Sequence, residues 1–228
     1  SYFNDLVLKT TNYIMMLAPI AIFSLFSNLL ATLDGEIMYS LIRFVIITII
    51  IFLLYMFFFY GSIVRLICKL NPYDFFKQIK EPLIFAFFSS SSSATMPLTL
   101  KTANNNLGIK KEVSSFVIPV GATVNMDGSA IYLGLSAIFI SQLIGLELTM
   151  AEYVIISMTA TIGSIGAAGV PSVALVMMTI VFTSVGIPIE AIAIIAGIDR
   201  FLDMFRTAIN VTGDLTISKI VDHINKIG

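Results

Sequence analysis

The chain has 228 residues, of which 57% are hydrophobic and 12% charged, and its mean hydropathy is +0.97. In soluble domains about a quarter of the residues are charged, so this composition excludes an ordinary soluble domain. The formal net charge of -1 points to no particular partner, and we expect no nucleic acid to bind. A single cysteine, Cys68, excludes a disulfide framework and a cysteine-rich metal site.

Two long apolar runs come first in the chain, at 13–33 and 41–66. Each approaches or exceeds the roughly 20 residues that a helix needs to cross a bilayer. The sequence therefore predicts an all-α membrane protein that crosses the lipid bilayer several times.

The basic residues predict the direction of each span. Lys and Arg cluster between the second apolar run and the next and recur at the C-terminus, but none occurs between Glu112 and Asp199. Because positively charged loops stay in the cytoplasm, the first span should run outward and the second, about 41–67, inward. A third span at about 113–143 runs outward. A last helix at about 190–222 returns inward and leaves the C-terminus in the cytoplasm.

Two further apolar segments do not fit a single crossing. The segment "FAFFSSSSSATMPLTL", residues 85–100, has basic residues on both sides, whereas residues 153–188 have acidic flanks and are interrupted by "GSIGAAGVPS", residues 163–172. Both ends of each segment thus belong on one side of the membrane. We predict two re-entrant helical hairpins, at about 75–106 and 152–187. Non-helical backbone at their tips is tolerated at membrane depth where it is buried in protein or lines a watery cavity.

The predicted order of elements forms an inverted repeat. A hairpin from the inside precedes an outward span, and a hairpin from the outside precedes an inward one. In secondary transporters the substrate and ion sites lie where such repeats meet, so the serine hydroxyls can face a polar ligand there. A flexible serine linker is the plain alternative, but such linkers are polar throughout, and this run lies between apolar segments.

The third span contains "GATVNMDGSA", residues 121–130. An ionisable residue inside a membrane is costly and indicates a functional site, which draws attention to Asp127. Asn125 and Gly128 beside it suggest a locally unwound helix, whose freed carbonyls are oxygen ligands for a small cation. A polar contact that only holds helices together is the alternative.

The last helix places Asp199, Asp203, Arg206, Asn210 and Asp214 at steps of four, three, four and four residues, which puts them on one face. A structural ladder of ion pairs is one explanation. In the functional one, Arg206 offers a planar fork to a carboxylate and Asp203 holds an ammonium group. That pair suits a zwitterion with an additional acid group. Asp214 and Asn210 would coordinate a cation together with the unwound third span.

Four motifs, "SSSSSATMP", "NMDGS", "GSIGAAGVP" and "DMFRTAINVTGD", in this order resemble the dicarboxylate/amino acid:cation symporter family, which includes sodium-coupled glutamate and aspartate transporters. The resemblance covers nearly the whole chain, and the chain's first helix resembles the family's fifth crossing helix. It implies eight crossing helices, two hairpins and a homotrimer in the full-length protein, placed in the plasma membrane. It also implies a transporter and not an enzyme. Residues 1–38 would then be a scaffold-type transmembrane helix and residues 39–228 the transport core.

The resemblance implies a set of substrate-binding residues: Ser91, Ser92, Ser93, Ser129, Val170, Asp203, Arg206, Thr207 and Asn210. The hairpin-tip serines would present backbone and hydroxyl groups to the substrate α-carboxylate, and Asn210 would face the same end. Asp203 and Thr207 would hold the amino group. Arg206 and Ser129 would hold the side-chain carboxylate.

Sodium is the implied coupling ion, with no other cofactor. One site would join the Asp214 carboxylate to the backbone carbonyls of Gly121, Asn125 and Asn210. A second would use carbonyls around Thr123, Ser164, Ile165 and Ala167, closed by the second hairpin. Asn125 and Asp127 would contribute to a third, whose other ligands lie outside this chain.

Some residues depart from the family pattern. Ser129 stands where acidic-amino-acid transporters usually have Thr, so the hydroxyl is kept and the methyl is lost. Leu133 replaces the protonatable Glu of animal glutamate transporters, which leaves proton and potassium coupling open. Ser90 and Met204 do not supply the arginine that other members use to support the hairpin tip, unless Arg200 reaches it.

Several functions remain open beside sodium-coupled transport of aspartate or glutamate. A C4-dicarboxylate has no ammonium for Asp203, and a neutral amino acid leaves Arg206 unpaired, whereas cystine fits both. An intramembrane protease is disfavoured, because no Asp lies in a Gly-x-Gly-Asp context and the single histidine, His223, is in the tail. The chain by itself could also be a non-functional C-terminal fragment.

Overall fold

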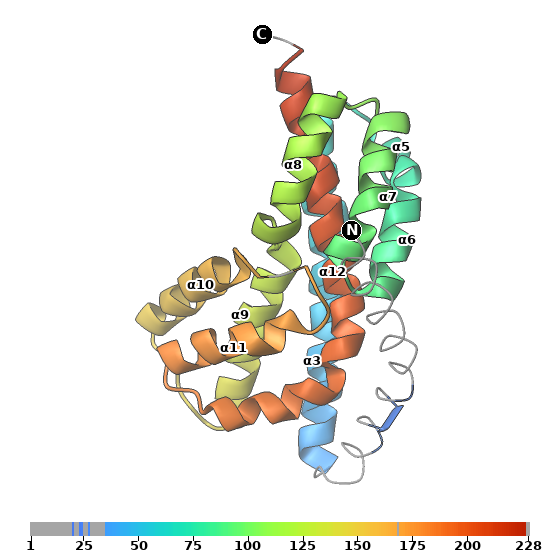
Figure 1. Ribbon diagram of the computed structural model, residues 1–228. Coiled ribbons are helices and arrows are strands. Elements are labelled where there is room, and N and C mark those ends of the chain that lie inside the picture. Colours follow the sequence, from blue (N-terminus) through green and yellow to red (C-terminus); the bar gives the residue numbers. More distant parts are fainter. Residues whose placement is uncertain (1–19, 21–22, 25–26, 28–34, 168, 227–228) are drawn as a thin grey trace, which may run out of the picture.

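The computed structural model describes residues 20, 23–24, 27, 35–167 and 169–226 (Figure 1). Every secondary-structure element from residue 35 onward within that part is helical, which confirms the all-α prediction there. The predicted first span, and with it most of the 1–38 segment, lies outside the described residues. The elements are α3 (Gly35–Leu54), the π-helical η1 (Tyr55–Tyr60), α4 (Gly61–Leu66), α5 (Pro72–Gln78), α6 (Lys80–Ser89), α7 (Ser92–Asn105), α8 (Lys111–Val124), α9 (Asp127–Leu143), α10 (Met150–Ser164), α11 (Val173–Ser184), the 3-10 turn η2 (Ile189–Ala191) and α12 (Ile192–Ile224).

Within the described residues, two helical runs are long and apolar enough to cross a membrane: Gly35–Leu66, formed by α3, η1 and α4, and Lys111–Leu143, formed by α8 and α9. The first begins at Gly35, earlier than the predicted start near residue 41. The second is interrupted as the sequence predicts, because α8 ends at Val124 and α9 begins at Asp127. The third predicted span is therefore a broken helix.

Two pairs of adjacent helices coincide with the predicted hairpin segments. Helices α6 and α7 pack against each other, as do α10 and α11 (Figure 1). The short helix α5 precedes the first pair and is separate from it. That these pairs enter the bilayer from opposite sides, as an inverted repeat, stays a prediction.

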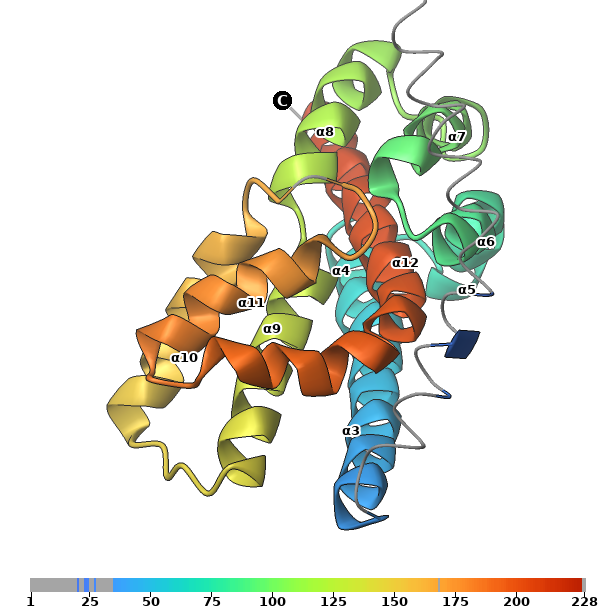
Figure 2. The same ribbon diagram turned by 60° about the horizontal axis from the view of Figure 1, so that its bottom comes forward.

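Helix α12 is the centre of the fold. It packs against α3, α6, α7, α8, α9 and α11, with α10 and α11 on one side of it and α6 and α7 on the other in both views (Figures 1 and 2). Its apolar residues contribute to two buried clusters, one containing Leu202 with Tyr132 and Met178, the other containing Leu215 with Phe75. The polar face of α12 is buried among these surrounding helices.

Much of the outer surface is apolar. The side chains of Phe57, Phe58 and Phe59 are all exposed, with Phe58 at 72%. Such an extended apolar surface is expected where lipid or other protein segments cover a membrane protein.

Candidate functional site

The serine run forms the sharp connection between α6 and α7. Ser89 ends α6, and Ser90 adopts the left-handed conformation, with φ 50° and ψ 35°. Ser91 caps α7, since its hydroxyl accepts a 3.1 Å hydrogen bond from the backbone N–H of Ala94, a role for which serine is among the preferred residues. The run therefore forms a helical tip and not a flexible linker.

The tip of the α6–α7 pair touches the tip of the α10–α11 pair. The Ser91 hydroxyl donates a 2.7 Å hydrogen bond to the carbonyl of Gly169, and the backbone N–H of Ser93 donates a 3.2 Å bond to the same carbonyl. A Cβ atom on Gly169 would lie 2.8 Å from the Ser93 hydroxyl oxygen. The second tip also reaches the broken helix, because the Gly166 N–H donates a 2.8 Å bond to the Thr123 carbonyl.

Asn210 joins the start of α9 to α12 through hydrogen bonds of its side chain. Its Oδ1 accepts a 2.9 Å hydrogen bond from the N–H of Gly128, one of the first-turn donors that have no partner within a helix. Its Nδ2 lies 3.4 Å from the Ser129 hydroxyl and 3.2 Å from Met126 Sδ. A Cβ on Gly128 would meet the backbone of Arg206 at 2.6 Å, so glycine allows this close approach.

Arg206 is buried between two carboxylates of its own helix. Its side chain is 1% exposed, its Nη2 lies 2.6 Å from Asp203 Oδ1, and its Nη1 lies 3.1 Å from Asp199 Oδ1. The guanidinium also lies over the ring of Tyr132, 4.5 Å from the centroid. Buried charges in proteins are normally paired in this way, because an unpaired buried charge is costly. The predicted polar face of α12 is thus buried in the fold, and Arg206 is paired on it with Asp199 and Asp203.

Asp203 also links α12 to the second hairpin. Its Oδ2 accepts a 2.8 Å hydrogen bond from the N–H of Ser172, at the start of α11. Arg200 Nη1 lies 3.7 Å from the same oxygen. Arg200 therefore contacts the carboxylate that faces the second hairpin.

A cavity of about 10 Å³ lies where the two tips, the break between α8 and α9, and α12 converge. It is lined by Ser90, Ser92, Met126, Ser129, Gly169, Val170, Val173, Asp203, Thr207 and Asn210. Most of the predicted substrate residues are in this set. Ser91 and Ser93 lie at the adjoining tip contact, and Arg206 contacts the lining residue Asp203. The volume is about that of one water position.

The residues of the first predicted cation site also lie together. Asn125 Nδ2 donates a 3.2 Å hydrogen bond to Asp214 Oδ1 and lies 3.5 Å from the Asn210 carbonyl. A Cβ on Gly121 would overlap Asp214 Oδ1. For the second site, the Thr123 carbonyl is brought to the loop after α10 by its bond with Gly166.

Asp127 has partners that the sequence interpretation missed. Its Oδ2 accepts hydrogen bonds from the hydroxyls of Tyr55, at 2.9 Å, and Tyr60, at 2.6 Å. No group of three or more His, Cys, Asp or Glu side chains within the described ranges is placed to hold a metal ion. The predicted cation sites depend on backbone carbonyls as well as carboxylates.

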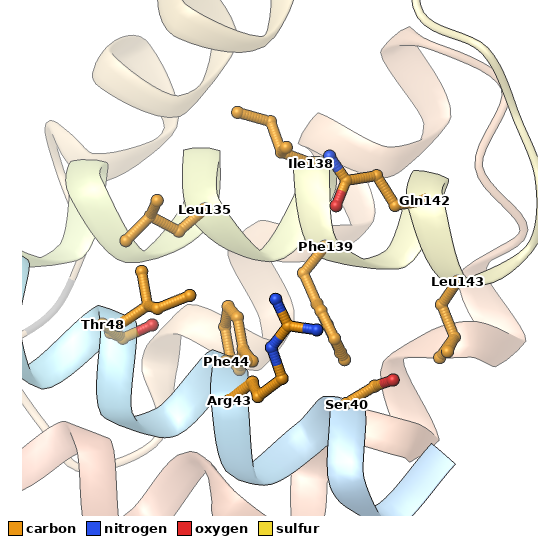
Figure 3. Close-up of a pocket in the computed structure, with 10 residues that line it drawn as sticks. Ser40, Arg43, Phe44, Thr48, Leu135, Ile138, Phe139, Gln142 and Leu143 are labelled. Carbon is orange, nitrogen blue, oxygen red and sulfur yellow. The ribbon is translucent and has the colours of Figure 1, made fainter. Parts of the chain in front are cut away.

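A separate cavity of about 380 Å³ lies between α3 and α9. Figure 3 shows Arg43 and Phe44 of α3 opposite Phe139 of α9, and Gln142 of α9 also lines the cavity. None of the predicted substrate or cation residues lines this cavity. The polar convergence at α12 is therefore the candidate site.

Residues 1–224 match the sodium:dicarboxylate symporter family. The chain belongs to this family. It is 40% identical over 225 residues to excitatory amino acid transporter 1 of Homo sapiens. The aligned region covers 98% of this chain and 42% of the relative. Excitatory amino acid transporter 2 of Homo sapiens is 39% identical over 98% of this chain and 39% of its own length.

A third relative is excitatory amino acid transporter 4 of Rattus norvegicus, 40% identical over 234 residues, with 98% of this chain and 40% of the relative covered. The chain thus spans about two-fifths of the length of the curated relatives it matches. Membership of the sodium:dicarboxylate symporter family confirms the resemblance drawn from the four motifs.

Proposed function

We propose that this chain forms the transport core of a sodium-coupled symporter for an acidic amino acid, aspartate or glutamate, acting by alternating access in the plasma membrane. The observation that carries the proposal is the buried pair of Asp203 and Arg206 beside the cavity at the meeting point of both hairpin tips and the broken helix. Membership of the sodium:dicarboxylate symporter family supports it.

The charges beside the cavity match the groups of an acidic amino acid. Arg206 is paired with two carboxylates, those of Asp199 and Asp203, and in this proposal a substrate side-chain carboxylate replaces one of these contacts on its planar fork. Asp203 Oδ2 faces the second hairpin, where a substrate ammonium could replace the N–H of Ser172. The N-terminus of α7 at the serine tip favours the α-carboxylate.

Substrate binding requires the tips to part. A cavity of about 10 Å³ cannot hold an amino acid, and the Ser91–Gly169 contact closes it. Glycine and proline in the second tip allow the backbone changes that opening needs. In this proposal the second hairpin opens toward the outside and closes over the substrate, while the Asp203–Ser172 bond is exchanged for a bond to the substrate.

Asn210 provides the link between substrate and sodium. Its side chain holds the start of α9 and reaches Ser129, a proposed substrate ligand. Its carbonyl faces Asn125 beside Asp214, the proposed sodium ligands. A sodium ion that orders these groups would therefore strengthen substrate binding, and the substrate would strengthen sodium binding by the same factor.

The remaining features of the proposal concern the assembly. The full-length protein would form a homotrimer in which the two helix pairs are re-entrant hairpins and the C-terminus is cytoplasmic. The other parts of that protein would supply the trimer scaffold and further ligands of the sodium site at Asp127. The family and the distribution of Lys and Arg support this arrangement.

The proposal is tested by uptake in proteoliposomes that contain the full-length protein. An inward sodium gradient should drive accumulation of labelled aspartate, and replacement of sodium by choline should abolish it. Excess glutamate or aspartate should compete, whereas serine should not. Competition by cystine would assign the substrate to the cystine alternative, and uptake that is independent of sodium would contradict the coupling.

A further inference from the structure

Two tyrosine hydroxyls converge on one oxygen of Asp127. The hydroxyls of Tyr55 and Tyr60 donate hydrogen bonds of 2.9 and 2.6 Å to Oδ2 of that carboxylate. Tyr60 is almost fully buried, at 1% exposure. Hydrogen bonds to an ionised carboxylate are roughly twice as strong as neutral ones. Because both bonds reach Oδ2, the other oxygen, Oδ1, is left to face another ligand.

The π-helical segment η1 makes this convergence possible. Residues five apart in an α-helix point about 140° away from each other, since each residue turns about 100°. The i→i+5 hydrogen bonds of a π-helix place such residues about one turn apart instead, and these segments occur frequently at functional sites. Segment η1 runs from Tyr55 to Tyr60, and the two rings contact edge to face, with centroids 5.3 Å apart.

Tyr60 also lies between two of the proposed sodium sites. A Cβ on Gly213 would meet both the Tyr60 hydroxyl and Asn125 Nδ2, which places these two groups around the same point. Asn125 in turn donates its 3.2 Å bond to Asp214. The Tyr60 hydroxyl, bonded to Asp127, and the Asn125 amide, bonded to Asp214, therefore lie near one point between η1, the helix break and α12.

We propose that Tyr55 and Tyr60 are positioning residues for sodium: they hold Oδ2 of Asp127 so that Oδ1 is presented to the ion. This inference rests on the proposed function, because it assigns a sodium ion to Asp127. Carboxylate oxygens suit hard cations, and a carboxylate already oriented loses less freedom when the ion binds. Through Asn125, Tyr60 also connects this ion to the one at Asp214, so its hydroxyl contributes to the cooperativity between them.

The test uses the full-length protein with Tyr60→Phe, Tyr55→Phe and the control Tyr73→Phe, in which the altered side chain is 73% exposed on α5. Aspartate binding is titrated with sodium, and aspartate affinity is measured again at saturating sodium. Because each variant loses a hydrogen bond to a charged group, the sodium concentration at half-maximal aspartate binding (the sodium midpoint) should rise about tenfold for Tyr60→Phe. It should also rise for Tyr55→Phe. The sodium titration curve of Tyr60→Phe should also be less steep. Aspartate affinity at saturating sodium, and all values for Tyr73→Phe, should stay unchanged.

A second comparison separates positioning from a merely structural role. When Asp127→Asn is already present, Tyr60→Phe should not raise the sodium midpoint further, because the two changes act on one interaction. If Tyr60→Phe and Tyr55→Phe lowered the thermal stability but left the sodium midpoint unchanged, the inference would be overturned while the proposed function would stay intact. Aspartate binding by the wild type without any sodium dependence would instead overturn the proposed function itself.

Discussion

The hydroxyl of Ser91 and the carbonyl of Gly169, 78 residues apart in the chain, are joined by a 2.7 Å hydrogen bond that closes one helical tip against the other. Gly169 lines the cavity together with Asp203, Thr207 and Asn210. The contact therefore lies beside the proposed substrate site, where we expect the gate of the proposed transporter.

Gly169→Ala tests this gate. The added methyl would lie 2.8 Å from the Ser93 hydroxyl oxygen and 3.1 Å from the Ala122 carbonyl, so the tips could no longer close as they do here. Overpacking of this kind costs about 1–3 kcal/mol, which predicts aspartate binding weaker by roughly 5- to 150-fold. Gly163→Ala, which meets nothing within 4 Å, is the matched control in the same hairpin. Equal aspartate affinities for both variants in calorimetry would place the gate elsewhere.

Gly121→Ala and Asp214→Asn test the first sodium site. The alanine Cβ would overlap the Asp214 carboxylate, and the asparagine removes its charge. Both should raise the sodium concentration that supports half-maximal aspartate binding, by about tenfold or more. On α9, Gly134→Ala would make only an ordinary contact, 4.0 Å from Ile156, and serves as the control. An unaltered sodium requirement in both test variants would reject the assignment.

Replacing Arg206 and replacing Asp203 should change substrate binding in different ways. Arg206→Gln removes the fork for a side-chain carboxylate and should abolish aspartate and glutamate binding while admitting a neutral amino acid such as serine. Asp203→Asn should weaken every amino-acid substrate, because each carries the ammonium group. Breaking a buried ion pair costs about 3–5 kcal/mol, so circular dichroism must first show that the variants fold. Competition binding with aspartate and serine then gives the two profiles, and identical profiles would remove the division of roles.

The predicted topology can be tested at the two ends of the broken helix. Lys110 precedes α8 and Glu147 follows α9, and both are exposed. In a Cys68→Ser background, Lys110→Cys should react with an impermeant thiol reagent from the inside and Glu147→Cys from the outside. Labelling of both from one side would end the inverted-repeat interpretation.

The polar face of α12 could be predicted from the sequence because its charged residues recur at steps of three and four, the period of an α-helix. The tip at Ser89–Ser93 could be predicted because five hydroxyls interrupt an apolar segment. In both places the local pattern and the final environment agree. The helix break after Val124 was likewise indicated by the adjacent asparagine and glycine.

The tyrosine contacts with Asp127 could not be predicted in this way. In "YMFFFY" the two tyrosines are five residues apart, a spacing that places them on different faces of an α-helix, and only the π-helical turn brings them together. The sequence analysis left a ladder of ion pairs open as one explanation of this face, but spacing alone does not show which carboxylate a long side chain will reach, and the structure pairs Arg206 with Asp199 as well as Asp203. The start of α3 at Gly35 was missed because "GEIMYS" is less apolar than the run that follows.

The most direct measurement of the central claim is competition between aspartate and succinate for the wild-type full-length protein, with and without sodium. The two compounds share both carboxylates and differ in the ammonium group that Asp203 is proposed to hold. We expect aspartate to bind far more tightly than succinate, by about a hundredfold or more if one charge-assisted contact worth about 3 kcal/mol is lost, and only when sodium is present. Succinate that competes as well as aspartate, or aspartate that binds equally without sodium, would contradict the account.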